Sequence, residues 1–262
     1  MILQLNDIRL TYQASSHNEV FDLLNGVDMD VKEGTVTALI GGNGAGKTTL
    51  FNIISGFEKG FMGKVWFKGY DITKMPAYEI SSKGMGRLFQ GRQLMNDLTL
   101  MENMKIASED TMGERPMQSL IRFRKVAQSE ARKEQQAIDV IKRVFGEDNK
   151  FLNMLDKKAS ALSYGEQRLI AMARLLMGHD SLLLLDEPTS GVNPLYIHAF
   201  SSIIKKMVRE EGRTVLLIEH NMAFVRRVAE QCHYLSDGVI IKKGRTDDVL
   251  NDPLIRKEYM GL

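Results

Sequence analysis

A glycine-rich segment that contains one lysine is the strongest chemical signal in this sequence. Residues 41–48 read GGNGAGKT and match the pattern G-x-x-x-x-G-K-[ST], between the strand-like run TVTALI and a helix-like stretch. In this setting the glycines let backbone N–H groups surround phosphate oxygens, and the N-terminus of the following helix adds positive potential. The pattern predicts a nucleotide phosphate site formed by Gly41, Asn43, Gly44, Ala45, Gly46, Lys47, Thr48 and Thr49.

Two side chains of this segment have distinct expected roles. The ammonium of Lys47 should reach the β and γ phosphates, and the Thr48 hydroxyl should coordinate a Mg²⁺ ion that bridges them. A glycine-rich turn that only tightens packing is the alternative, and Lys47 and Thr48 in register disfavour it. Guanine-reading proteins need N-K-x-D, whereas the only Asn-Lys pair, at residues 149–150, continues as Phe-Leu. An adenine nucleotide, ATP, is therefore favoured.

Two adjacent carboxylates end an apolar run at residues 181–188, which read SLLLLDEP. Such a run indicates a buried strand, and ligands of parallel sheets bind beyond the carboxyl ends of the strands. Asp186 is suited to hold Mg²⁺, and Glu187 to polarise an attacking water as the catalytic base. An acidic strand end found alone usually has no catalytic role, but this one accompanies a phosphate loop.

The segment LSYGEQ, residues 162–167, precedes a predicted helix. Ser163 and Glu166 have the spacing of a capping box, in which each side chain accepts a hydrogen bond from the backbone of the other residue. The same arrangement exposes a helix N-terminus beside a hydroxyl and Gly165, which suits an anion such as a γ-phosphate. Structural capping and phosphate binding are compatible at this position.

The elements that must position these residues alternate between strand and helix patterns. Short β-rich runs dominate residues 3–68, with one helix after Lys47, and alternation returns after Leu162. The chain then ends in a predicted hairpin around Asp237 and Gly238. These features predict an α/β fold.

The middle of the chain has a different pattern. Over residues 99–156 the strand signal fades, and apolar side chains recur at helical spacing at Ile138, Ile141, Val144 and Phe145. The order of patterns predicts a single domain over residues 1–262. Its core should comprise residues 1–91 and 161–262, with a helical subdomain inserted at about 92–160.

Composition excludes several classes of function. Lys and Arg number 35 against 33 Asp and Glu, for a formal net charge of +2, so nothing in the bulk charge favours nucleic acid as a partner. Apolar runs such as Leu182–Leu185 are far shorter than the ~20 residues needed to cross a bilayer, so any membrane association requires a partner. The single cysteine, Cys232, cannot form an internal disulfide, which fits a reducing compartment.

LSYGEQ is similar to the signature of ABC ATPases, and the phosphate loop, this signature, LLLLDE and His220 follow one another in the order of that family. The resemblance covers nearly the whole chain. It implies a RecA-like phosphate-loop core with an antiparallel β subdomain and an inserted helical subdomain. It further implies that Tyr12 stacks on adenine, that Gln90 of RLFQ links Mg²⁺ and water to the partner, and that His220 contacts the γ-phosphate.

The resemblance also implies partners. Two ATPase subunits, identical or different, would close head to tail, with each phosphate loop facing the other's signature and hydrolysis loosening the pair. Ser190–Asn193 would touch the opposite subunit, and Asn193 stands where the family most often has Asp. A separate permease would place the protein at the cytoplasmic face of the inner or plasma membrane. Gln90–Met104, with apolar Leu94 and Met95, would receive a short helix of that permease, and a buried hinge is the alternative for this segment.

The segments GMGRLFQ, LTLMENM, SGVNP and LIEHNMAFV narrow the resemblance to the ATPases of branched-chain amino acid uptake. The lipopolysaccharide-export ATPase is a near relative, whose signature usually has Gly where Tyr164 stands. Soluble ABC proteins of ribosomes or DNA repair are a second alternative, but they normally carry two cassettes or a long coiled coil. A nucleotide sensor without activity is disfavoured by Glu187.

Overall fold

The computed structural model describes residues 1–13, 20–89, 94–108 and 123–260. By packing, the chain divides into two units. The first comprises Met1–Gln90, Asp180–Ser190 and Ile204–Leu262, and the second comprises Gly91–His179 and Gly191–Ile203. Nothing in this division fixes the predicted limits of the helical subdomain, which stay a prediction.

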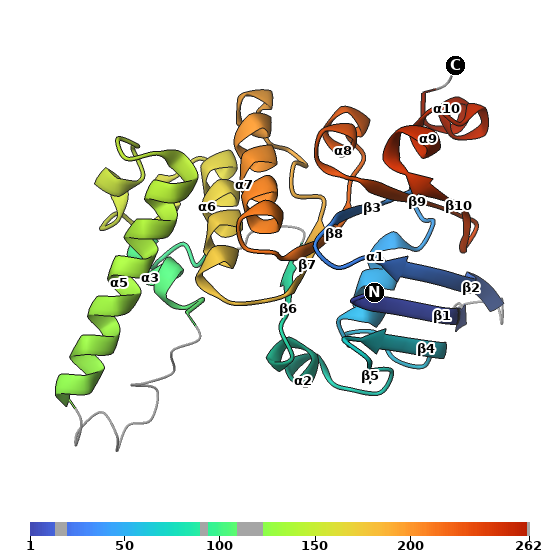
Figure 1. Ribbon diagram of the computed structural model, residues 1–262, viewed down its shortest axis with the longest axis horizontal. Helices are drawn as coiled ribbons and strands as arrows, with labels where there is room; N and C mark the ends of the chain where they lie inside the picture. Colours follow the sequence, from blue (N-terminus) through green and yellow to red (C-terminus); the bar gives the residue numbers. More distant parts are fainter. Residues whose placement is uncertain (14–19, 90–93, 109–122, 261–262) are drawn as a thin grey trace. The chain divides into compact units, whose positions relative to one another are not determined.

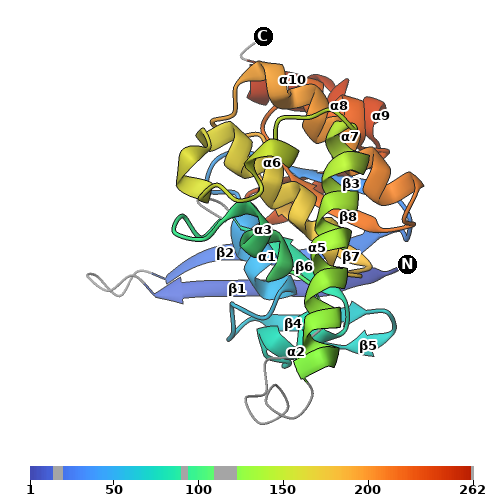
Figure 2. The same cartoon turned by 90° about the vertical axis from the view of Figure 1, so that its left-hand side faces the viewer.

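A four-stranded antiparallel sheet forms one layer of the first unit (Figure 2). Its strands are β1 (Leu3–Gln13), β2 (Val20–Val31), β4 (Met62–Phe67) and β5 (Tyr70–Asp71), in the order β2-β1-β4-β5. Side chains alternate along β1 on either side of an irregularity between Leu5 and Ile8, so that Leu3, Leu5, Ile8 and Leu10 are all buried. The alternation thus gives this sheet one face toward the core.

A six-stranded sheet forms the second layer of the first unit. Its order is β10 (Val239–Arg245), β9 (Gln231–Ser236), β3 (Val36–Ile40), β8 (Thr214–Ile218), β7 (Leu182–Asp186) and β6 (Met85–Leu88). Neighbouring strands pair in parallel except β9 and β10. Every residue of β3, β7 and β8 is buried, as expected where helices or another layer cover both faces.

Helix α1 (Lys47–Ile54) lies between the two sheets (Figure 1). Its Leu50, Phe51 and Ile54 join a core that includes Leu5 from the antiparallel sheet and Leu184 from the parallel one. The remaining helices of this unit are α2 (Ala77–Ser82), α8 (Met222–Val228), α9 (Thr246–Leu250) and α10 (Pro253–Met260). The phosphate-loop helix is therefore anchored along its length by apolar contacts.

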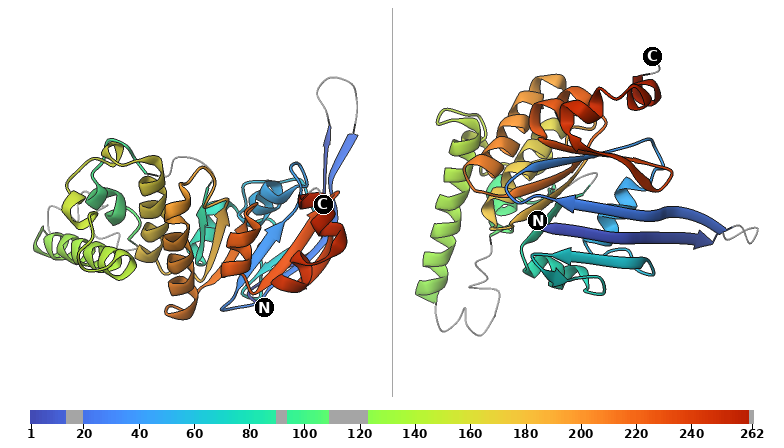
Figure 3. Two further views of the ribbon diagram at one scale, coloured as in Figure 1. Left: turned by 90° about the horizontal axis from the view of Figure 1, so that it is seen from above. Right: turned by 45° about the vertical axis from the view of Figure 1, so that its right-hand side comes forward.

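The hairpin predicted around Asp237 and Gly238 is confirmed. Ser236 pairs with Val239, and the two residues between them have positive φ angles of 48° and 72°, as a two-residue hairpin turn requires. The Asn25 backbone N–H donates to the Gly238 carbonyl at 2.8 Å, which holds the tip of the hairpin against β2 (Figure 3).

The second unit is helical. It contains α3 (Leu100–Lys105), α5 (Phe123–Phe145), α6 (Tyr164–Arg174) and the first part of α7 (Ile197–Arg209). Short 3₁₀ turns lie at Leu152–Met154, Ala159–Ala161, Leu175–Met177 and Pro194–Tyr196. The predicted α/β phosphate-loop fold with an antiparallel β subdomain and a helical insertion is confirmed.

The buried face of α5 differs from the predicted stripe, in which Val144 and Phe145 are only half-buried. Ile141 is buried as expected, but its buried neighbours are Ala137 and Val140, whereas Ile138 is also only half-buried.

Within the described residues, no helix is both long enough and apolar enough to cross a membrane.

Candidate functional site

The glycine-rich loop connects β3 to α1 and packs closely on β9. A Cβ atom on Gly41 would lie 2.1 Å from the carbonyl oxygen of Leu235, so only glycine lets the backbone approach β9 this closely. At the other end of the loop, Gly46 caps α1 with a φ of 96° in the left-handed region. The pattern of glycines in the sequence therefore has a steric cause at both ends of the loop.

Lys47 lies across this loop. Its Nζ donates to the carbonyl oxygens of Gly41 at 2.8 Å and Gly42 at 2.7 Å, and the residue is only 6% exposed. Burial lowers the pKa of Lys47, against which the charges of Glu187 and Asp186 act. The ammonium therefore lies inside the loop, within electrostatic reach of both predicted carboxylates.

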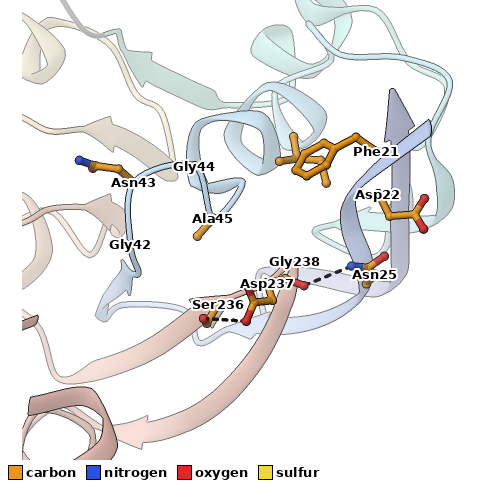
Figure 4. A pocket seen from close by; sticks show the side chains of 11 residues that line it. Phe21, Asp22, Asn25, Gly42, Asn43, Gly44, Ala45, Ser236, Asp237 and Gly238 are labelled. Carbon is orange, nitrogen blue, oxygen red and sulfur yellow. Dashed lines mark hydrogen bonds between the residues drawn. The ribbon is translucent and has the colours of Figure 1, made fainter. Parts of the chain in front are cut away.

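A pocket of about 270 Å³ adjoins the loop (Figure 4). Of the residues predicted to bind nucleotide, Asn43, Gly44 and Ala45 line it. Its other walls were missed by the sequence analysis: Phe21, Asp22, Leu23 and Asn25 from β2, and Ser236, Asp237 and Gly238 from the hairpin tip. The Asp-Gly pair signalled the turn, but no local pattern signalled that this turn borders the loop.

Tyr12 and Phe21 face one another across β1 and β2. Directly opposite residues of antiparallel strands present their side chains on the same face. Phe21 lines the pocket and is 59% exposed, whereas the Tyr12 hydroxyl donates to Glu58 at 2.8 Å. Partial burial and the hydrogen bond to Glu58 raise the pKa of Tyr12. Phe21 is thus the aromatic side chain that lines the pocket beside the phosphate loop, whereas the predicted Tyr12 is not among the residues that line it.

The last residue of β7 is Asp186, which is 1% exposed. Its Oδ2 accepts a hydrogen bond from Arg87 Nη2 at 3.4 Å. Its Oδ1 is buried and has no hydrogen-bond partner among the residues that the structure describes. Burial raises the pKa of Asp186, opposed chiefly by the Arg87 charge.

This carboxylate fits a divalent cation. Mg²⁺ takes oxygen ligands and usually binds through one or two carboxylates together with substrate phosphates and waters. The buried Oδ1 of Asp186 is such a donor, and the exposed Thr48 follows Lys47 on α1. No group of three or more His, Cys, Asp or Glu that could hold a metal ion by itself occurs in the described part of the chain.

Glu187 and His220 meet at the edge of the parallel sheet. Strand pairing sets Asp186 opposite Ile218, so the residues that follow both strands come together. Glu187 Oε1 lies 3.0 Å from His220 Nε2. Glu187 has a φ of 47°, rare for a residue with a side chain, and its N–H donates to the Ile218 carbonyl. Strain of this kind persists where surrounding contacts fix the backbone.

Glu219 supplies those contacts and was missed by the sequence analysis. It is 3% exposed, and its Oε1 accepts hydrogen bonds from both the backbone N–H and the hydroxyl of Thr189. Its Oε2 accepts from the backbone N–H of His220 at 3.1 Å. Glu219 therefore joins the segment after β7 to the segment after β8. The only local signal was an acidic residue that ends an apolar strand.

The signature segment lies in the second unit, where the predicted capping box is confirmed. Ser163 caps α6: its Oγ accepts from the Glu166 N–H, and Glu166 Oε2 accepts from the Ser163 N–H at 2.8 Å. Lys150 forms an ion pair with Glu166. Although burial opposes the shift, Lys150 and Ser163 lower the pKa of Glu166. Gly165 is buried against Tyr196, where a Cβ would lie 3.0 Å from the ring.

Three further predicted positions differ in what the structure gives. Gln90 lies outside the described residues. Thr49, in the first turn of α1, is half-buried. The Asn193 side chain caps the Pro194–Tyr196 turn by accepting from the Leu195 N–H at 3.0 Å, a role that Asp can also fill, so the departure from the family pattern leaves this local structure intact.

Comparison with known proteins identifies relatives over nearly the whole chain. Residues 24–190 match the ABC transporter family. The chain is 35% identical to the probable branched-chain amino acid transport ATP-binding protein LivG of Archaeoglobus fulgidus, over 95% of both chains. It is 32% identical to the high-affinity branched-chain amino acid transport ATP-binding protein BraF of Pseudomonas aeruginosa, over 91% of both.

Solved structures give the same picture. A nucleotide-free ATP-binding cassette from an ABC transporter superposes with a TM-score of 0.77 at 31% identity, covering 100% of this chain and 99% of the other. The ADP conformation of another cassette gives a TM-score of 0.79 at 30% identity, with the same coverage. CbiO1 of Clostridium perfringens, described as part of an ABC transporter complex, gives 0.75 at 25% identity, covering 100% and 95%.

Proposed function

Because the chain belongs to the ATP-binding subunits of the ABC transporter family and is an ATPase, we propose that it drives a separate membrane permease for branched-chain amino acid uptake. The observation that carries this proposal is the similarity over 95% of the chain to a protein named for that transport. The site is consistent with it, since the phosphate loop, Asp186, Glu187 and His220 all lie in the first unit. No described helix could provide the transmembrane path itself.

In the proposed reaction the loop holds the phosphates of ATP. Lys47 exchanges its bonds to the Gly41 and Gly42 carbonyls for the β and γ phosphates, and its charge offsets the charge that develops there. Thr48 and Asp186, with Gln90 as a further predicted ligand, would hold Mg²⁺, which would supply positive charge next to the phosphates. Phe21 and Tyr12 would contact the adenine.

Hydrolysis requires a general base and a group that contacts the γ-phosphate. Glu187 orients a water and accepts its proton while the water oxygen bonds to the γ-phosphorus and the bond to the β–γ bridging oxygen breaks. ADP and inorganic phosphate are the products. His220, whose Nε2 lies 3.0 Å from Glu187 Oε1, would hold this carboxylate, and we propose that it also contacts the γ-phosphate.

A second copy, or a related subunit, is proposed to complete the site. Ser163, Gly165 and Glu166 form a capped helix N-terminus, which attracts a phosphate through its N–H groups and dipole. ATP between this end and the loop of the partner would bind the closed pair far better than the open one. Lys47→Ala and Ser163→Arg subunits, each inactive alone, should then regain partial activity when mixed. No recovery in mixed dimers shown to form would contradict a shared site.

The permease contact is proposed near the start of the second unit, which would place the protein at the cytoplasmic face of the membrane. The predicted anchors Leu94 and Leu100 are buried, which supports the hinge alternative for these two residues. Met95 and Ile106 are 54% and 53% exposed, and Leu98 and Ile106 line a hollow of about 450 Å³. Met95 and Ile106 are therefore the better candidates for contact with a permease helix.

The test is reconstitution. The chain is co-expressed with branched-chain amino acid permease subunits, purified as a complex, and placed in vesicles in which ATP-dependent leucine uptake is measured. Glu187→Gln serves as the turnover-deficient control. Met95→Asp should release the permease while the isolated ATPase rate is kept. Met62 on β4 is also exposed, and Met62→Asp should leave both permease binding and the ATPase rate unchanged. Failure of the parent chain to bind any permease or to support uptake would overturn the proposal.

A further inference from the structure

Arg87 is a buried arginine that the proposed reaction does not use. It lies on β6, next to β7 in the parallel sheet, and its side chain is 6% exposed. Burial lowers the pKa of Arg87, opposed by Asp186. A buried charge is costly unless it is paired and hydrogen-bonded, so its retention beside the metal carboxylate calls for a physical reason.

The guanidinium is fixed from two sides. Nη1 donates to the Ser55 hydroxyl at 2.7 Å, and Nη2 donates to Asp186 Oδ2 at 3.4 Å. Ser55 is in turn fixed, because its hydroxyl donates to the Phe51 carbonyl at the end of α1. Arg87 thus ties the end of the phosphate-loop helix to the end of β7.

Three aromatic rings enclose the same group. The guanidinium carbon lies 4.6 Å from the ring centre of Phe89, 5.9 Å from that of Phe57 and 5.8 Å from that of Phe51. Phe57 and Phe89 themselves meet edge to face at 5.3 Å. Contacts of a cation with aromatic rings are more often made by arginine than by lysine. The rings leave the guanidinium few alternative orientations.

We propose that Arg87 is a positioning residue for the metal site: by holding Oδ2 of Asp186, it leaves Oδ1 as the oxygen presented to Mg²⁺. The buried Oδ1, which has no partner among the described residues, is the observation that supports this division of roles. Groups that orient a metal ligand typically change metal affinity about 10- to 100-fold when they are removed. The inference rests on the proposed Mg²⁺–ATP role of Asp186.

The experiment measures metal binding directly, with Mn²⁺ as a paramagnetic probe titrated into the protein with a non-hydrolysable ATP analogue. Arg87→Gln should weaken Mn²⁺ binding about 10- to 100-fold and leave metal-free nucleotide affinity unchanged. Arg87→Lys keeps the charge but not the planar fork, so the defect should persist. Full recovery in the lysine variant would show that only charge is needed and would overturn the positioning role.

Ser55→Ala keeps Arg87 and removes one of its anchors, so it should weaken Mn²⁺ binding less than Arg87→Gln but measurably. If Arg87→Gln fails to fold, the Ser55→Ala variant tests whether Arg87 positions Asp186. Ser201→Ala is the matched control, since Ser201 is also buried and also donates to the carbonyl four residues earlier, but in α7. Unchanged Mn²⁺ affinity, or an equal loss of metal-free nucleotide affinity, would overturn the inference. If the parent chain itself binds no Mn²⁺ with nucleotide, the proposed metal role fails first.

Discussion

Replacing Gly41 with alanine should disable the phosphate loop by moving its backbone. The added Cβ would lie 2.1 Å from the Leu235 carbonyl oxygen, and Cβ atoms essentially never have contacts under 3.0 Å, so the loop and β9 must separate by about 1 Å. The Gly41 carbonyl is one of the two that accept from Lys47. A displacement of about 1 Å at a reacting centre can cost on the order of 100-fold in rate, which is the loss expected in kcat/KM.

The control for this variant lies in the same sheet. Gly244 on β10 has a φ of 157°, nearly equal to the 159° of Gly41, but a Cβ there would meet nothing within 4 Å. The conformational cost of placing alanine at this φ angle is therefore similar in the two variants, and only the contact with β9 differs between them. Steady-state phosphate release, together with melting temperature, separates loss of catalysis from loss of folding. Equal activity of Gly41→Ala and Gly244→Ala would refute the argument from close packing.

Three further predictions follow from the same geometry. Glu187→Gln should bind ATP but lose at least about 100-fold in phosphate release, the usual contribution of a general base, and turnover at the parent rate would exclude Glu187 from that role. Phe21→Ala should weaken ATP binding about tenfold, more than Tyr12→Ala, in a nucleotide titration, since base stacking contributes about 1–3 kcal/mol and Phe21 lines the pocket. Burial lowers the pKa of His233 from 6.5 to about 4, so the unfolded chain takes up a proton first as pH falls. The contribution of neutral His233 to the free energy of unfolding is fully present above about pH 7 and should fall by about 2 kcal/mol by pH 5. Urea unfolding at both pH values should show that His233→Gln removes this loss.

The parts of the site that could be predicted from the sequence depend on residues that are close together in the chain. The phosphate loop, the strand that ends in Asp186 and the Ser163 capping box each depend on a few consecutive residues with a fixed spacing. Their physics is local: glycine conformations, continuous burial and helix capping. Local patterns of this kind indicate a fold and the core of a site reliably, because no distant residue is needed to form them.

The parts that were missed depend on pairing between distant segments. Phe21 lines the pocket together with the hairpin tip, to which β2 is joined by the hydrogen bond from the Asn25 N–H to the Gly238 carbonyl. Glu219 holds Thr189, 30 residues earlier, because β7 and β8 are neighbours in the sheet. Arg87 meets Asp186, 99 residues later, for the same reason in β6 and β7. The spacing of residues along the sequence does not show which strands pair with each other or in which register.

Two further differences concern which apolar side chains are buried. The stripe predicted on α5 included Ile138, which is only half-buried, whereas the smaller Ala137 is fully buried. Leu94 was predicted as an anchor for a permease helix, with a buried hinge as the alternative; it is buried, which favours the alternative, whereas Met95 is exposed. Hydrophobicity alone does not distinguish a buried anchor from an exposed one in a short segment without clear periodicity.

The contacts that hold each functional group lie within its own unit. In the first unit, Lys47 binds the loop carbonyls and Glu219 fixes the segments that carry Glu187 and His220. In the second, Glu166 and Lys150 fix the N-terminus of α6. Both halves of the proposed shared site are therefore formed before they meet, so that closure around ATP requires docking of ordered surfaces and little new ordering of side chains. ATP can then bind the closed pair of subunits more tightly than the open pair. This difference in binding free energy is what can be coupled to a change in a permease.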